Sequence, residues 1–473
     1  MKNIRYSLIA VSLLSSMLNA ATDLDTSLSQ DHTFERKVVK EQGIDIVDGW
    51  EFSGDIRAGW VEYDYQNPPK ADGSATYPSR NKGHIDSKGI YTMPKISISS
   101  PKDSRIRVKA TLAGATDFGI NDEKYESRTF VFDPSEKKSF IILQEGYLEY
   151  IDKENKALIG REELTTPMID ADDWYMLANS FEIAYYVNSS LEDIDITAGY
   201  FDRMSGVWDS GANGTEFHSM SQASFIDGVD KSVIEDKGVY FAAVGFNDDK
   251  NHNLQVWDYY ADDMYNTLFV QYDYTNGVGS FNYDFGLQFI NFKEVGYLAT
   301  DAASTNIDYS LYSARFDGDF SNGFNFATGY AKYTDGEGQG ATLGAFGGYP
   351  YFANGMIFHF FEAGSLQNAA SYKAQIGYDF KSLGVDDLWI GYRYTYFDLD
   401  SSNSFAKKEI TDSNGDKKLV TDPTKPQGAM ALNGIRISYG AEAGAYFTGT
   451  YEHVNLDNEP NTFSLRLIGG YKF

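Results

Sequence analysis

The sequence predicts an all-β protein, a transmembrane antiparallel β-barrel of about 18 strands with short periplasmic turns and long extracellular loops. Three observations support this prediction. Aromatic residues make up 15% of the chain, with 35 Tyr and 32 Phe, and the 44 Gly far outnumber the 11 Pro. Apolar and polar residues alternate along many short segments, and the connections between these segments alternate between long and tight. A barrel that is apolar outside, polar inside and edged with aromatic residues has this composition and pattern.

The N-terminal residues have the features of a secretory signal peptide. Lys2 and Arg5 precede a short apolar run, and Ala20 and Ala21 are small residues that suit cleavage after either one. The apolar run is too short to span a bilayer, so the pattern predicts export and not a membrane anchor. The predicted organisation is a signal peptide (1–21), a periplasmic N-terminal segment (22–48) and the barrel (49–473).

Cysteine content and charge exclude several classes of function. The chain has no Cys, which excludes a disulfide framework, a thiol nucleophile and cysteine metal sites. Its net charge of −28 does not suit a nucleic-acid binder. The acidic excess suits a solvated surface, or one that divalent cations bridge to anionic outer-membrane lipid and lipopolysaccharide.

Period-2 alternation bounded by turn residues defines the strands. Each segment is close to the length that a tilted membrane strand needs. The predicted strands are 49–63, 88–99, 104–116, 138–151, 155–163, 180–188, 193–204, 236–247, 252–260, 264–275, 279–293, 304–317, 322–333, 367–380, 386–398, 427–439, 444–454 and 460–473.

The connections indicate which end of the barrel faces the periplasm. Long connections such as 117–137 and 205–235 alternate with tight turns such as Lys153–Glu154–Asn155, except near 261–263, where a long one is expected. Outer-membrane barrels have short periplasmic turns and long outer loops. An even strand count with both ends in the periplasm closes the sheet without a free edge.

Basic residues at inward positions are candidates for the pore wall. In the strand RIRVKATL, apolar Ile106 and Val108 suit the lipid face, so the basic residues between them must point inward, because a charge facing mid-membrane lipid costs about 2–4 kcal/mol. A basic row in a narrow channel attracts anions. The alternative is that these cations are solvated and paired with carboxylates such as Asp55, Glu145 and Glu149. The candidates are Arg57, Arg105, Arg107, Lys109, Arg393, Arg436 and Arg466.

An acidic segment follows the strand that ends near residue 163. If this segment folds into the barrel, its carboxylates oppose the basic wall and form a narrow constriction with a transverse field. The alternative is an ordinary outer loop that lies on the rim. The acidic candidates are Glu162, Glu163, Asp170, Asp172 and Asp173.

The same region resembles the OprD-type outer-membrane porins. The resemblance lies in the run QEGYLEY (144–150), in Gly160-Arg161, in Thr166-Pro167 and in NSFE (179–182), and it is specific over about 140–205. It implies an 18-stranded barrel whose third outer loop narrows the pore, and passage of small solutes such as carboxylates or amino acids along a ladder of arginines.

Residue by residue, the resemblance adds one candidate and shows two departures. Arg161 matches the family's Gly-Arg pair and is therefore a further pore-lining candidate. Tyr175 stands where an Arg commonly precedes the Met, and Ala178 stands where a Pro is usual.

Motifs for metals, cofactors and catalysis are weak or absent. Asp412, Asn414 and Asp416 alternate like the start of a calcium loop, but the glycine at the sixth position and a closing Glu are missing. The six His residues are scattered without ligand spacing, and none pairs locally with a Ser and an Asp. We expect no cofactor, no structural metal and no enzymatic activity.

The pattern as a whole predicts a passive porin in the outer membrane of a Gram-negative bacterium, giving passage to small hydrophilic solutes with a preference for anionic or zwitterionic ones. The alternative is a surface adhesin or structural barrel that displays long loops. The terminal Phe473 resembles the signal that barrel-insertion machinery reads, and the sequence is compatible with a monomer or a homotrimer.

Overall fold

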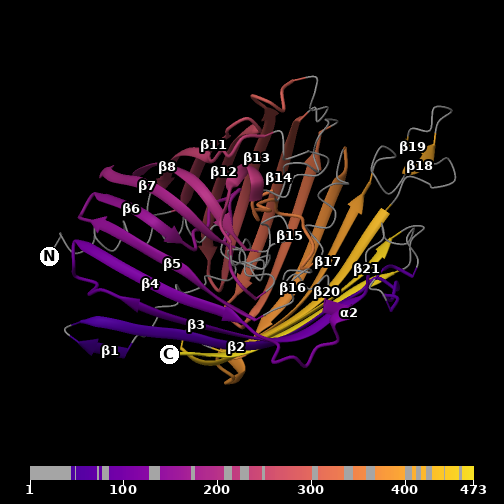
Figure 1. The fold of residues 1–473 in the computed structure, drawn as a ribbon, viewed down its shortest axis with the longest axis horizontal. Helices are drawn as coiled ribbons and strands as arrows, with labels where there is room; N and C mark the ends of the chain where they lie inside the picture. The colour runs from indigo at the N-terminus through magenta and orange to yellow at the C-terminus, as the bar shows by residue number, and fades with distance from the viewer. Residues whose placement is uncertain are drawn as a thin grey trace.

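A computed structural model shows long antiparallel strands that form one curved sheet closed into a barrel (Figure 1). It describes residues 44–47, 49–71, 74–76, 85–126, 139–171, 176–206, 216–223, 234–247, 251–300, 307–334, 345–357, 368–399, 407–411, 417–421, 429–440, 443–456 and 461–473. The predicted signal peptide, and the part of 22–48 before Ile44, lie outside the described residues.

Eighteen of the described strands make up the wall, as predicted, and every predicted strand coincides with one of them. They are β2 (Trp50–Asp64), β3 (Ser87–Ser99), β4 (Ile106–Ala115), β5 (Phe140–Ile151), β6 (Asn155–Glu162), β7 (Ser180–Leu191), β8 (Ile194–Ser205), β10 (Val239–Asn247), β11 (His252–Ala261), β12 (Tyr265–Val278), β13 (Phe281–Glu294), β14 (Asp308–Phe320), β15 (Phe324–Tyr333), β16 (Ala370–Asp379), β17 (Leu388–Asp398), β20 (Ala429–Gly440), β21 (Gly444–Leu456) and β22 (Thr462–Lys472).

The described residues also form short strands and helical turns in addition to the 18 strands of the wall. β1 (Ile44–Val47) pairs with the start of β2, and β9 (His218–Ser219) pairs with the end of β8. A separate hairpin of β18 (Lys407–Thr411) and β19 (Lys417–Thr421) projects from the rim (Figure 1). The helical turns are α2 (Glu123–Glu126), α3 (Met220–Ala223) and η6 (Phe380–Leu383). No described helix combines the length and the apolar character needed to cross a membrane.

The barrel closes where the last strand meets the first. β22 pairs antiparallel with β2 from Lys472 opposite Asp55 to Phe463 opposite Asp64. Phe473 continues the ladder, donating its N–H to the Gly54 carbonyl at 3.0 Å and accepting the Gly54 N–H at 2.9 Å. A Cβ on Gly54 would lie 2.5 Å from the Phe473 ring, so glycine is needed at this close approach. Closure satisfies the backbone groups of both terminal strands, as a bilayer requires.

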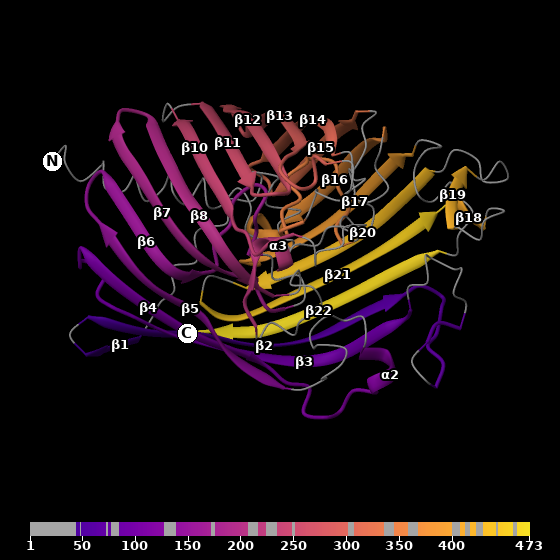
Figure 2. The ribbon, with the colours of Figure 1, turned by 45° about the horizontal axis from the view of Figure 1, so that its top comes forward.

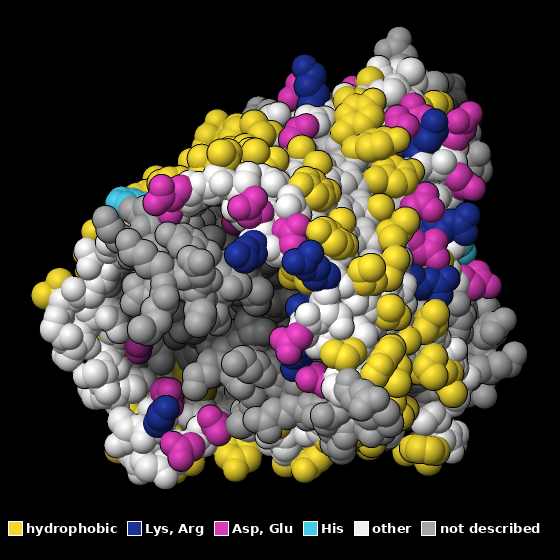
Figure 3. Space-filling view, turned by 90° about the vertical axis from the view of Figure 1, so that its left-hand side faces the viewer, with side chains coloured by type: hydrophobic (Ala, Val, Ile, Leu, Met, Phe, Trp, Pro, Cys, Tyr) yellow, Lys and Arg dark blue, Asp and Glu magenta, His cyan; other side chains and the backbone are white. Residues whose placement is uncertain are grey.

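Alternation along the strands separates an apolar outer face from a polar inner face. Ile141 is 77% exposed and Ile159 is 62% exposed, as expected for side chains that meet lipid. Their strand neighbours Ile142 and Leu158 are buried on the inner side. Figure 3 shows hydrophobic side chains gathered over the outer wall, and charged side chains around a hollowed face.

The connections alternate in length as predicted. The connection between β7 and β8 has two residues and that between β12 and β13 also has two, whereas the connection between β8 and β10 has 33. The exception near 261–263 is also real, because only Asp262, Asp263 and Met264 separate β11 from β12. Apart from this exception, the long loops share one end of the barrel and the tight turns share the other.

Candidate functional site

Two loop segments fold into the barrel and meet there (Figure 2). Segment 163–171 follows β6, and segment 345–357 lies between β15 and β16. Ile169 forms isolated bridges with Phe346 and Gly347, and the Asp170 N–H donates to the Phe346 carbonyl at 3.1 Å. The described part of the third outer loop thus lies inside the lumen, and the described segment 345–357 of the β15–β16 loop, which the sequence analysis did not predict to fold inward, lies there with it.

The acidic candidates of the third loop lie against the neighbouring wall. Glu163 forms an ion pair with Lys95 of β3, and Glu162 lies on the inner face at the end of β6. Asp170 is buried and accepts a hydrogen bond from the Thr165 hydroxyl at 2.8 Å. Asp172, Asp173 and Tyr175 lie outside the described residues.

Burial raises the pKa of Glu163, and the ammonium group of Lys95 opposes that rise. Glu163 therefore takes up a proton at a higher pH than a solvated glutamate does. The charge of this side of the lumen consequently changes at a higher pH than it would with a solvated glutamate at this position.

The basic candidates of β4 are paired with carboxylates. Lys109 forms an ion pair with Glu145 at 2.9 Å, and Arg107 forms one with Glu149 at 3.4 Å. Arg105 precedes the first residue of β4 and is exposed near the tight turn. The alternative considered from the sequence, cations paired with carboxylates, therefore describes Arg107 and Lys109.

A β-bulge brings the partner of Lys109 to the inner face. The pairing of β4 with β5 shifts register between Thr111 and Leu112, so that Gln144 and Glu145 are both buried on the inner side. Glu145 also accepts a hydrogen bond from the Thr111 hydroxyl at 2.7 Å.

The part of the wall on the other side of the β22–β2 seam carries inward arginines on three of its four consecutive strands. Arg393 of β17, Arg436 of β20 and Arg466 of β22 all lie on the inner face, each no more than 3% exposed. Thr450 of β21 lies opposite both Arg436 and Arg466 in the two ladders, and its hydroxyl oxygen accepts a hydrogen bond from Arg436 at 2.9 Å. Arg57 of β2 extends this wall, with its Nε 3.9 Å from a carboxylate oxygen of Asp55.

Arg161 does not line the pore, and this corrects the expectation drawn from the resemblance. It lies opposite Glu182, between inward Gly160 and inward Glu162, and therefore points outward. Arg161 donates to Glu182 at 2.9 Å, and its guanidinium lies 4.0 Å from the ring centroid of Phe217. An outward charge at the end of a strand is tolerated because the cost falls to about 0–1 kcal/mol near the interface.

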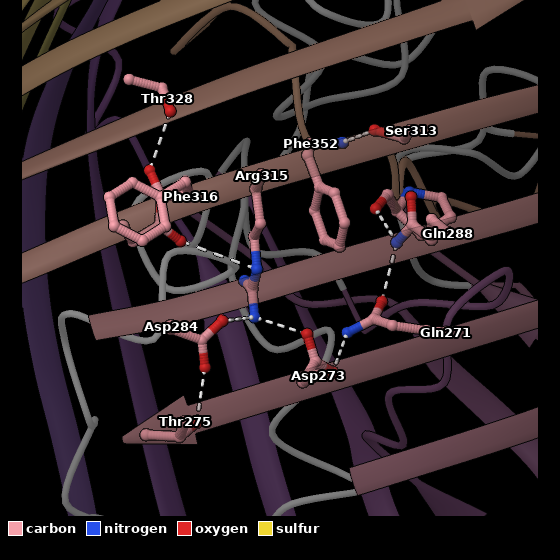
Figure 4. A network of polar contacts seen from close by, with 12 residues as sticks. Gln271, Asp273, Thr275, Asp284, Gln288, Ser313, Arg315, Phe316, Thr328 and Phe352 are labelled. Carbon is pink, nitrogen blue, oxygen red and sulfur yellow. Dashed lines mark hydrogen bonds and ion pairs between the residues drawn. The ribbon is translucent and has the colours of Figure 1, made fainter. Parts of the chain in front are cut away.

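Arg315 of β14 is an inward cation that sequence reasoning missed (Figure 4). Its guanidinium lies 2.7 Å from Asp273, 2.8 Å from Asp284 and 3.6 Å from Asp317. The ring of Phe352, from the inward loop, lies 4.7 Å away. The alternation in SLYSARFDG would have found Arg315, because apolar residues flank it as they flank Arg393.

Lys373 of β16 is a second inward cation that the same rule would have found. It is 4% exposed and lies opposite Thr395 of β17 in the ladder. The inward basic side chains therefore extend over a wider part of the wall than the sequence analysis predicted.

The described residues contain no group of three or more His, Asp or Glu side chains arranged to hold a metal ion. The calcium-like stretch Asp412–Asp416 lies outside the described residues.

Comparison with known proteins decides the family. The family model "outer membrane porin, OprD family" matches residues 155–418, more than half of the chain. The chain belongs to the OprD family. The expected family, fold and location in the Gram-negative outer membrane are thereby confirmed, and so is a porin function for small solutes.

Solved porin structures share the fold of this OprD-family protein. OccK8 (OprE) of Pseudomonas aeruginosa is 16% identical with a TM-score of 0.65, over 90% of this chain and 98% of that one. A BenF-like porin from Pseudomonas fluorescens Pf-5 is 15% identical with a TM-score of 0.67 and the same coverage. OccAB4 of Acinetobacter baumannii is 15% identical with a TM-score of 0.66, over 92% of this chain and 99% of that one. The search of curated protein sequences finds no match.

Proposed function

We propose that this porin favours small anionic or zwitterionic solutes, such as carboxylates and amino acids. The observation that carries the proposal is the arginine wall, formed by inward Arg393, Arg436 and Arg466 on three of four consecutive strands, β17, β20 and β22. Arg393 and Arg436 donate hydrogen bonds to the neutral acceptors Gln375 and Thr450. Positive charge along a low-dielectric wall raises the local concentration of anions.

A relative gives independent support for the solute class. The OpdK porin of Pseudomonas aeruginosa, 14% identical with a TM-score of 0.62, has a structure with vanillate, which is a carboxylate. The carboxylates of Glu163 and Asp170 lie on the inward loop, where Glu163 pairs with Lys95 and Asp170 accepts a hydrogen bond from Thr165.

Reversal potential under a salt gradient tests the proposal. Purified wild-type protein in a planar bilayer should show anion preference, and Arg436→Gln with Arg466→Gln should reduce it. The matched control is Arg436→Lys with Arg466→Lys, which keeps both positive charges on the same strands and should keep the wild-type preference. Unchanged selectivity in the glutamine variant would refute the role of this wall.

The remaining partners are also part of the proposal. We propose that Phe473 is read by the barrel-insertion machinery before it closes the seam with Gly54, and that the apolar outer face meets outer-membrane lipid and lipopolysaccharide. We further propose that the protein acts by passage alone, without catalysis, as a monomer or a homotrimer. A peptide and phospholipid hydrolysis assay and the mass of the detergent-solubilised protein address the last two statements.

A further inference from the structure

We propose that Glu452 is a positioning residue that fastens the inward segment 350–357 to the wall and so sets the width of the pore. The proposal rests on the lumen being the solute path, but not on the proposed preference for anions. Its basis is a set of contacts between one buried carboxylate and the backbone of the loop.

Glu452 lies on the inner face of β21 and is fully buried. Its two carboxylate oxygens accept hydrogen bonds from the backbone N–H groups of Met356 and Ile357, each at 2.6 Å. Hydrogen bonds to an ionised acceptor are stronger than neutral ones. A carboxylate can serve two adjacent donors together, whereas a neutral amide offers one oxygen.

Side chains from other strands hold the segment just before this point. The Thr395 hydroxyl donates to the Asn354 carbonyl at 2.9 Å, and Arg393 donates to the Gly355 carbonyl at 3.4 Å. On the other flank, the Phe352 N–H donates to Ser313 at 3.0 Å. The segment therefore lies across the inner face of β14, β17 and β21, and Glu452 holds its far end.

Packing leaves little room for the segment to shift while it is fastened. A Cβ on Gly355 would lie 2.5 Å from Leu432 Cδ2 and 3.1 Å from Glu452 Oε1. A Cβ on Gly434 would lie 2.6 Å from Met356 Sδ. The segment thus rests directly on the wall at β20 and β21, and loss of Glu452 removes the two charge-assisted hydrogen bonds that hold it there.

Two consequences follow when the carboxylate is removed. The segment can move away from the wall, which widens the free cross-section of the pore. This movement also exposes the guanidinium of Arg393, which is fully buried beneath the segment. We expect on the order of a twofold rise in open-channel conductance for Glu452→Ala, because pore width governs passage through a water-filled channel. We also expect a shift of the reversal potential toward anions.

A reversible disulfide tests the effect of the loop's position separately from the effect of the charge at residue 452. The chain has no native Cys, so Gly355→Cys with Leu432→Cys in the Glu452→Ala background gives one defined disulfide. An ideal Cβ at residue 355 lies 2.5 Å from Leu432 Cδ2, which places the two side chains in contact, and a disulfide joins Cβ atoms about 3.8 Å apart. Oxidation should return the conductance to the wild-type value, and reduction should raise it again, although the charge at 452 is absent in both states.

A variant on the loop side keeps the proposal testable if Glu452→Ala fails to fold. Ile357→Pro removes one donor and leaves Glu452 in place, and Ile357→Ala is its matched control because it keeps the N–H. The proline variant should show the larger conductance and the alanine variant the wild-type one.

The outcomes distinguish the proposal from the porin function. Wild-type conductance in folded Glu452→Ala, or no response of the cysteine pair to oxidation, would overturn the role of Glu452. Absence of any channel activity in the folded wild-type protein would instead refute passage through this lumen.

Discussion

Replacing Arg315 should destabilise the barrel strongly, because three carboxylates depend on it. The guanidinium lies within 2.8 Å of Asp273 and Asp284 and 3.6 Å from Asp317, and all four side chains are at most 5% exposed. Removing one partner of a buried ion pair costs about 3–5 kcal/mol, since it leaves an uncompensated buried charge. We expect Arg315→Gln to lose stability in this range.

Urea unfolding in detergent, followed by the electrophoretic shift between folded and unfolded barrel, measures this loss. Arg315→Lys should lie between wild type and Arg315→Gln, because an ammonium is a point charge that does not reproduce the guanidinium fork. Adding Asp284→Asn to Arg315→Gln should recover part of the stability by removing one of the freed charges. Wild-type stability of Arg315→Gln would refute the coupling of the three carboxylates through Arg315.

Two further predictions concern the pH response and the seam. Acidification should shift the reversal potential toward anions, because protonation of Glu163 leaves Lys95 as a net positive charge. The shift should begin at a higher pH than for a solvated glutamate, because burial raises the pKa of Glu163. The Glu163→Gln variant should show the shifted potential at neutral pH and lose this response to acid. Gly54→Val should impair closure of the barrel, because even a Cβ would lie 2.5 Å from the Phe473 ring. The folding yield into detergent measures this effect, and Ala58→Val on the exposed outer face of β2 is the control. An unchanged yield for Gly54→Val would contradict the argument.

The strands could be predicted from the sequence because lipid and water impose alternation residue by residue. The inward positions of Arg393, Arg436 and Arg466 follow from the same rule. The rule would also have predicted the inward position of Arg315. The outward position of Arg161 could not be predicted by this rule, because Leu158 and Ile159 are both apolar and do not show which face the next residues occupy. The ladder with β7 decides it by setting Arg161 opposite Glu182.

The contacts that shape the lumen could not be predicted in the same way. The bulge at Thr111/Leu112, which turns Gln144 and Glu145 to the same side, has no marker in the alternation. The bonds from Met356 and Ile357 to Glu452 join residues about 95 positions apart along the chain. Such pairings depend on how a long loop packs against strands that are distant from it in the sequence, and local patterns carry no information about that packing.

The two walls of the lumen differ in how their charges are arranged, and this difference bears on selectivity more than the number of cations does. On the β3–β6 side, Lys95, Lys109 and Lys156 each form an ion pair with a glutamate. A paired charge acts on a passing ion as a dipole, whose field falls off faster than that of a single charge. On β17 and β20, Arg393 and Arg436 donate hydrogen bonds to the neutral acceptors Gln375 and Thr450, which carry no charge of their own. An anion should therefore follow the β17–β22 wall, although the sequence places the densest run of cations on β4.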